Sequence, residues 1–322
     1  MYSLSDIKKG IRNPELVKEE IRSRFYPLLH PIRTLKSEYI ACVQRYTYHR
    51  SGYDYNPDGV DIFEEDWDNL ILLDACRYDE FSNACTLPGE LEHRISRGST
   101  SNEFVRGNFS DRRLDDVVYV SDNQWYARLE DDINAEIHDF VSAPIDGDAH
   151  GGLLNHPSTV TRIAKNTAEE YPNKRLIVHY LQPHSPYFTA DGEESFRVPS
   201  LSNLRDSRPP FRRDRSRREV IEAYRSTLEL VLHHVEDLLE SLPGKTVISA
   251  DHGEMLGERA WPIPFRIYDH PGAVYTEQLV KVPWFVHEFS ERKDIVGERS
   301  DNSVSVDEDD VEDKLRALGY RV

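Results

Sequence analysis

Five short apolar runs, each bounded by polar residues, constrain the fold of this chain more than any other feature of its sequence. Runs of this length and composition are typical of strands that are buried on both faces of a parallel sheet. Helical patterns lie between them, most clearly at 158–171 and 217–242. The alternation predicts an α/β fold in which helices cover both faces of a mostly parallel sheet. The five runs are 69–74 (NLILLD), 117–121 (VVYVS), 175–181 (RLIVHYL), 245–250 (KTVISA) and 282–287 (VPWFVH).

The segments outside these runs suggest three parts. Residues 1–50 carry apolar side chains at helix-like spacing, and we interpret this arm as packed onto the domain; a docking helix and a membrane-surface helix are the alternatives. The predicted organisation is a helical extension at 1–50, a catalytic domain at 51–290, and an acidic tail with a closing helix at 291–322. The apolar repeat of the extension consists of Leu16, Val17, Ile21, Phe25, Leu28 and Leu29.

The charge of the chain is strongly negative. Its 40 Lys and Arg residues stand against 58 Asp and Glu residues, so the formal net charge is −18. Such a surface repels the phosphate backbone, and we therefore expect no nucleic-acid partner. Acidic residues spread along a chain keep a protein soluble in high salt, which favours a halophilic source, such as a haloarchaeon, over an ordinary acidic cytosolic enzyme.

Cysteine content and hydropathy indicate the compartment. Cys42, Cys76 and Cys85 are too few for a disulfide framework and lack the spacing of a zinc site. The first 20 residues lack the apolar centre of a signal peptide, and no run approaches the roughly 20 apolar residues that a membrane-spanning helix needs. We expect a soluble, cytoplasmic protein without a membrane-spanning segment; the oligomeric state stays open.

Residues able to bind a metal follow three of the predicted strands. Asp74 ends the first run, His184 lies just past the third, and Asp251 and His252 follow the fourth. Open α/β sheets bind their ligands at the carboxyl ends of their strands. Each residue alone has a structural explanation, as a helix N-cap, a core histidine or part of a turn. Together, at successive strand ends, they predict a site for Zn²⁺, Mn²⁺ or Mg²⁺.

Three motifs turn this pattern into a family resemblance. Asp74 after an apolar strand, the segment SADHGEMLGE and the segment HPGAVYTEQLVKVPWFV together resemble the alkaline phosphatase/sulfatase superfamily over about residues 65–290. The segment RGSTSNEF (97–104) is similar to the GxTSxxEF nucleophile turn of lipoteichoic acid synthases and related phosphoglycerol transferases. The resemblance implies an alkaline phosphatase-like three-layer sandwich with Thr100 as nucleophile. A capping box of Thr100 with Glu103 is the structural alternative, and both can hold.

The resemblance also implies a cofactor and its ligands. One divalent ion (Mn, Zn, Mg or Ca) is favoured over two. In two-metal members an Asp and two His residues bind the second ion; His184 and His270 match two of these positions, and no third is evident. With one ion, these histidines are expected to orient the substrate or protonate the leaving group. The ligands implied for the favoured ion are Asp74, Thr100, Asp251 and His252.

Three further elements are candidates for substrate binding. Arg77 follows the metal-binding Asp74 and is a candidate contact for the anionic group, although pairing with Asp79 is favoured. Asn123 lies just after a predicted strand, where it can line the pocket. The Arg-rich segment within 190–218 is interpreted as a solvated loop rather than an anion-binding surface.

The reaction follows from what the motifs include and omit. Nothing fits the CxPxR motif that sulfatases convert to formylglycine, since CTLPGE at Cys85 has its Pro one place too late and no matching Arg. Phosphate esters are therefore favoured over sulfate esters, with hydrolysis through a covalent Thr intermediate. The alternatives are a soluble transferase that passes a phosphoryl-containing group to a glycan or lipid acceptor, and a non-catalytic binding module. The expected partner is an anionic ester, with glycan- and lipid-linked esters among the candidates.

Overall fold

A seven-stranded sheet forms the centre of the computed structural model, which describes residues 31–143, 155–189, 192–196, 215–298 and 308–317. The strand order is β2-β9-β8-β1-β5-β3-β4, and β9 is antiparallel to both of its neighbours, whereas the pairs from β8 to β4 are parallel. The strands are β1 (Asn69–Leu73), β2 (Gly89–Ile95), β3 (Arg113–Ser121), β4 (Glu136–Ser142), β5 (Arg175–Tyr180), β8 (Thr246–Ser249) and β9 (Lys281–His287); β6 (Tyr187–Phe188) pairs with β7 (Glu194–Phe196) in a separate small sheet.

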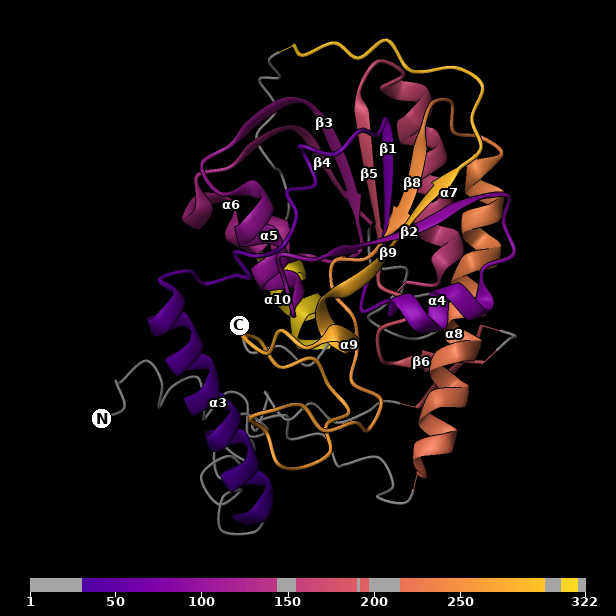
Figure 1. The fold of residues 1–322 in the computed structure, drawn as a ribbon. Coiled ribbons are helices and arrows are strands. Elements are labelled where there is room, and N and C mark those ends of the chain that lie inside the picture. Colours follow the sequence, from indigo (N-terminus) through magenta and orange to yellow (C-terminus); the bar gives the residue numbers. More distant parts are fainter. Residues whose placement is uncertain (1–30, 144–154, 190–191, 197–214, 299–307, 318–322) are drawn as a thin grey trace, which may run out of the picture.

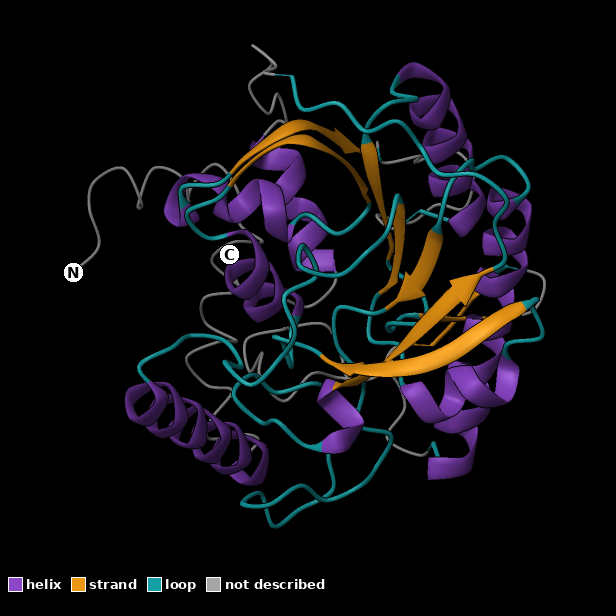
Figure 2. Cartoon of the chain, turned by 45° about the horizontal axis from the view of Figure 1, so that its top comes forward, coloured by secondary structure: helices purple, strands orange, loops and turns teal. Residues whose placement is uncertain are grey.

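Helices cover both faces of the sheet (Figures 1 and 2). On one face lie α4 (Tyr78–Ala84), α7 (Pro157–Glu170) and α8 (Arg217–Leu239), and on the other α5 (Ser101–Phe109), α6 (Trp125–Ile133) and α10 (Glu308–Ala317). Because side chains alternate along a strand, β1 contributes Ile71 and Leu73 to the first core and Leu70 and Leu72 to the second. The predicted mostly parallel α/β sandwich of three layers is confirmed.

The five apolar runs all form strands of this sheet, and two edge strands were not predicted. Every residue of β1 is buried between β5 and β8, whereas most residues of the edge strand β2 are exposed or half-exposed. Strands β2 and β4 contain Glu, His, Arg and Asp, which one solvated side permits. An apolar run therefore identifies the buried strands only.

Helix α3 (Pro31–Ser51) is the described part of the predicted N-terminal extension. Its Ile40 is buried in an apolar cluster with Met255, Ile263 and Leu279 from the segment that precedes β9. The whole of the predicted apolar repeat, at positions 16–29, and most of the Arg-rich segment lie outside the described residues. In the ranges that the structure describes, no helix is both long enough and apolar enough to cross a membrane.

The closing helix forms as α10, Glu308–Ala317, beside α6, where the sequence predicts a helix at 311–319. Its Val311 and Leu315 enter the second core, and Lys314 is buried with them. The C-terminal part of the chain therefore completes one helical layer of the sandwich. This layer lies next to the carboxyl end of β3, which contributes to the site described below.

Candidate metal centre

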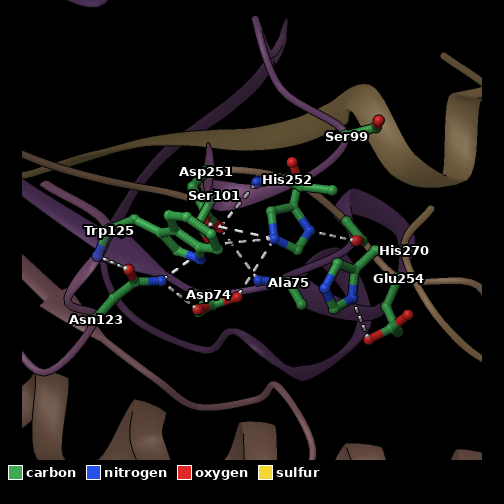
Figure 3. A network of polar contacts seen from close by, with 12 residues as sticks. Asp74, Ala75, Ser99, Ser101, Asn123, Trp125, Asp251, His252, Glu254 and His270 are labelled. Atoms are coloured by element: carbon green, nitrogen blue, oxygen red, sulfur yellow. Dashed lines mark hydrogen bonds and ion pairs between the residues drawn. The ribbon is translucent and has the colours of Figure 1, made fainter. Parts of the chain in front are cut away.

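Three of the predicted ligands meet at the carboxyl ends of β1 and β8 (Figure 3). Asp74 follows β1, and Asp251 and His252 follow β8, which pairs in parallel with β1. Each offers one ligand atom, and these atoms lie within 4.8 Å of one another. The Nε2 atom of His252 is 3.4 Å from Asp74 Oδ1 and 3.5 Å from Asp251 Oδ2. The sheet thus brings together residues that are about 180 positions apart in the sequence.

The chemistry of these three side chains fits a divalent cation. Asp74 Oδ1 and Asp251 Oδ2 are buried and have no hydrogen-bond partner among the described residues. Burial and the adjacent Asp251 raise the pKa of Asp74 well above its usual range, because two buried carboxylates repel each other. A cation between them removes that repulsion and occupies the orphaned oxygens.

His252 is prepared to bind such an ion as a neutral imidazole. Burial lowers its pKa to about 4, so the ring is uncharged at neutral pH. Its Nδ1 lies 2.8 Å from the carbonyl oxygen of Gly253, which requires the proton to be on Nδ1. The lone pair of Nε2 is therefore directed at Asp74 and Asp251. Holding the non-ligating nitrogen in this way is the usual means of orienting a metal-binding histidine.

A second group of potential ligands lies beside the first. His184, Glu254 and His270 each offer an atom within 4.8 Å of the others, and all three are buried. The His270 ring lies 4.9 Å from the His184 ring and 4.5 Å from the His252 ring, measured between centroids. Glu254 is the residue that sequence reasoning missed, although it belongs to the DHGE segment. It approaches His270 Nδ1 to 3.2 Å with one carboxylate oxygen.

The charge of this second group differs from that of the first. Burial disfavours the charged form of His270, but Glu254 and Asp269 outweigh it and raise the pKa of His270 to about 10. The ring is then a cation at neutral pH and can donate a proton to a bound anion. This arrangement fits the predicted role of His270 in orienting a substrate or protonating a leaving group.

The predicted nucleophile turn carries two hydroxyl groups with different surroundings. Thr100 is the N-cap of α5, and its Oγ1 accepts a hydrogen bond from the backbone N–H of Glu103. Ser101, the next residue, is fully buried, and its Oγ lies 3.4 Å from His252 Nε2. The capping box predicted as the structural alternative forms only in part. The bond from the Glu103 N–H to Thr100 Oγ1 is present, but the Glu103 carboxylate accepts the N–H of Ser99 instead of that of Thr100.

The two predicted substrate contacts fall in different places. Asn123 joins the site, because its Nδ2 donates to Asp74 Oδ2 at 2.8 Å and to Ser101 Oγ at 2.9 Å. Arg77 is paired with Asp79 at 2.6 Å and with Glu258 at 2.9 Å, the arrangement that the sequence favours for it. Its guanidinium is held by carboxylates of the scaffold.

His179 is a further buried group at the site that the sequence analysis missed. It lies at the end of β5, with Nε2 3.6 Å from Asp251 Oδ2 and Nδ1 2.8 Å from the Tyr119 hydroxyl. Burial lowers the pKa of His179, so this ring is also neutral. A histidine inside the apolar run RLIVHYL was the only signal available. A buried polar residue near the carboxyl end of a central strand indicates a functional site, because a buried polar group needs a partner.

The sheet and the site together define a class: an α/β sandwich with buried carboxylate and histidine side chains grouped at its strand ends, where they could hold a metal ion. No model of a known protein family matches the chain, and no curated protein matches its sequence. Solved structures do show similarity. The C-terminal periplasmic domain of the phosphoethanolamine transferase EptC from Campylobacter jejuni has 16% sequence identity and a TM-score of 0.41, over 68% of this chain and 77% of that one.

Two other similar structures come from different proteins. The phosphoglycerol transferase GacH from Streptococcus pyogenes, in complex with sn-glycerol-1-phosphate, has 12% identity and a TM-score of 0.37 over 89% of this chain and 91% of that one. A protein in the alkaline phosphatase superfamily from Vibrio parahaemolyticus has 10% identity and a TM-score of 0.38 over 78% and 65%.

Proposed function

We propose that this protein is a divalent-metal-dependent phosphoesterase that acts through a covalent intermediate on a hydroxyl of the turn before α5. One observation carries the proposal: Asp74, Asp251 and His252 present three buried donor atoms to one point, beside a hydroxyl at the start of a helix. Two buried carboxylates that face each other are costly to a structural core. A metal-assisted transfer of an anionic group explains the whole set.

Asp74, Asp251 and His252 would hold the cation, which supplies the positive charge that stabilises an ionised hydroxyl and the oxygens of a phosphoryl group. The residues of this chain perform the other tasks. The first backbone N–H groups of α5 face the anionic group, as at many phosphate sites. His270 and His184 lie next to this point and act on the leaving oxygen, His270 as the proton donor. The sequence predicts Thr100 as the attacking residue of this turn.

Water is the proposed acceptor for the second step, and the proposed substrate is an anionic phosphate ester, with glycan- and lipid-linked esters as the candidates. Transfer to an alcohol acceptor is the alternative outcome of the same chemistry, because the covalent intermediate is common to both. The cation is proposed to be Mn²⁺, Zn²⁺ or Mg²⁺, all of which accept carboxylate and imidazole ligands. A cytoplasmic location stays a prediction.

The proposal is tested by turnover of p-nitrophenyl phosphate, bis(p-nitrophenyl) phosphate and p-nitrophenyl sulfate in high salt with each metal. Metal-dependent release of p-nitrophenol from a phosphate ester, abolished by Asp251→Asn, is the expected result. Lys165→Met, which changes an exposed pair with Asp237, is the control and should retain activity. Added glycerol separates hydrolysis from transfer through the appearance of glycerol phosphate. Stoichiometric metal binding with no turnover of any ester would instead favour a binding module.

A further inference from the structure

Three consecutive hydroxyl groups, of Ser99, Thr100 and Ser101, approach the start of α5, and the structure gives each a different task. Ser99 Oγ donates to the Glu103 carboxylate at 2.9 Å and lies 3.2 Å from the Pro271 carbonyl oxygen. Thr100 Oγ1 accepts the Glu103 N–H at 3.3 Å as the helix cap. Ser101 Oγ alone among the three has contacts with His252 and Asn123. Two of the hydroxyls therefore shape the turn, and the third faces the metal ligands.

The spacing of the donor atoms matches a four-coordinate ion. Ser101 Oγ lies 3.4 Å from His252 Nε2, and Asp74 Oδ1 and Asp251 Oδ2 lie 3.4 and 3.5 Å from that same nitrogen. Ligands at the corners of a tetrahedron, with metal bonds of about 2.1 Å, are separated by about 3.4 Å. Ser101 Oγ thus lies as far from His252 Nε2 as the two carboxylate oxygens do, at the separation that a tetrahedral site requires. The sequence resemblance had implied Thr100 for this fourth position.

We propose that Ser101, and not Thr100, is the catalytic hydroxyl that attacks the phosphate ester; this assignment rests on the proposed function. A nucleophile must lie beside the groups that stabilise its ionised form. Ser101 meets this condition, because it is next to the ligand atoms and at the first residue of α5. Thr100 points its oxygen along the helix, where it accepts the Glu103 N–H.

Asn123 is assigned a positioning role for this hydroxyl. Its side-chain oxygen accepts the backbone N–H of Trp125 at 3.0 Å, which fixes the orientation of the amide. Its Nδ2 is then directed at both Ser101 Oγ and Asp74 Oδ2 (Figure 3). A fixed donor at the attacking oxygen stabilises negative charge that develops there. Asn123 therefore acts through Ser101 and Asp74.

The reaction balances without a co-reactant. The Oγ of Ser101 forms a bond to phosphorus as the bond from phosphorus to the leaving oxygen breaks. The hydroxyl loses one proton, and the departing alkoxide gains one, so the products are a phosphoserine and an alcohol. Water then attacks the phosphoserine, restores the hydroxyl and releases inorganic phosphate. The intermediate is therefore a phosphate ester on residue 101.

The direct test is the location of the covalent phosphate. The full-length protein is mixed with Mn²⁺ and p-nitrophenyl phosphate and quenched in acid, which preserves phosphoserine. Peptide mass spectrometry then separates phosphate on Ser101 from phosphate on Thr100, since fragment ions between the two residues differ. We expect phosphate on Ser101. Phosphate on Thr100 would overturn the assignment and leave the proposed function standing, whereas no turnover by the wild type would refute both.

Variants provide a second test, with both turnover and Mn²⁺ binding as readouts. Ser101→Ala should lower turnover by on the order of 10³-fold, and should weaken Mn²⁺ binding by about tenfold in calorimetry, because one oxygen of the ligand set is lost. Ser110→Ala, an exposed serine at the end of the same helix, is the matched control and should change neither quantity. Thr100→Ala should retain Mn²⁺ affinity. Full activity in Ser101→Ala, or loss of Mn²⁺ binding in Thr100→Ala alone, would overturn the proposal.

Discussion

The buried ion pair between Lys314 and Asp122 offers a sharp test of the packing described here. Lys314 comes from α10 and is 2% exposed, and Asp122 follows β3 and is 1% exposed. The ammonium donates to Asp122 Oδ1 at 3.0 Å and to the carbonyl oxygen of Ala143. Asp122 directly precedes Asn123, so the pair links the last described helix to the edge of the metal centre. The perturbation is Lys314→Met, which keeps most of the side-chain volume and removes the charge.

The expected cost follows from the partners that remain. Removal of one member of a buried pair costs about 3–5 kcal/mol, because the other charge is left in a medium of low polarity. Asp122 keeps a hydrogen bond from Asn155 Nδ2 at 2.8 Å, which places the estimate at the lower end, about 3 kcal/mol. The variant Lys314→Met/Asp122→Asn removes both charges, and we expect it to lose less than about 1.5 kcal/mol.

Urea unfolding, followed by circular dichroism and fluorescence, measures these free energies. Lys165→Met is the matched control, because its pair with Asp237 is solvent-exposed, with side-chain exposures of 29% and 53%. Such a pair contributes at most about 1 kcal/mol. If Lys314→Met loses no more free energy of unfolding than Lys165→Met, or if the double variant is less stable than the single one, the reasoning from burial is wrong.

Three further predictions concern metal, pH and the turn before α5. Mn²⁺ should raise the melting temperature of the wild type in scanning fluorimetry, and Asp251→Asn should abolish the rise; an equal rise in the variant would place the ion elsewhere. Burial raises the pKa of Glu130 to about 7, so the contribution of Glu130 to stability falls as pH rises from about 4.5 to 7. Relative to the wild type, Glu130→Gln should therefore gain about 1 kcal/mol between pH 5 and pH 8 in urea unfolding, after allowance for solvent screening. Tyr48→Phe removes the donor to the buried Glu103 carboxylate and should cost about 2 kcal/mol, with Tyr46→Phe, an exposed tyrosine of the same helix, as the unchanged control. A loss of equal size in both tyrosine variants would contradict the assigned bond.

The central strands of the sheet could be predicted from the sequence, because a strand that is buried on both faces appears as a continuous apolar run. A strand such as β1, between two other strands and under helices on both faces, is apolar along most of its length, from Leu70 to Leu73. The edge strands β2 and β4 show no such run, since one side of each is free to carry charged residues. Their position beside β9 and β3 depends on pairing with distant segments, which local pattern does not encode.

Most of the site was also readable, because parallel strands align their carboxyl ends. Asp74, Asp251 and His252 were identified from their positions after apolar runs, and the structure brings their ligand atoms within 4.8 Å. Glu254 and His179 were missed for different reasons. Glu254 lies within a known motif but turns toward His270 only through the path of the loop. His179 lies inside an apolar run, and the periodicity of hydrophobic residues gives no indication that its side chain faces Asp251.

The sequence by itself determined the class of fold, and it predicted the strand ends that carry the candidate ligands and the turn that carries the candidate hydroxyls. Only the tertiary structure decided which hydroxyl faces the ligands. Thr100 and Ser101 are adjacent and chemically alike, so no spacing rule distinguishes them. The distinction arises because α5 begins at Ser101: its cap turns the Thr100 oxygen toward the Glu103 N–H, and the next side chain points at His252. Direction of a side chain is a property of the folded backbone, and a one-residue difference in where a helix begins is enough to change it.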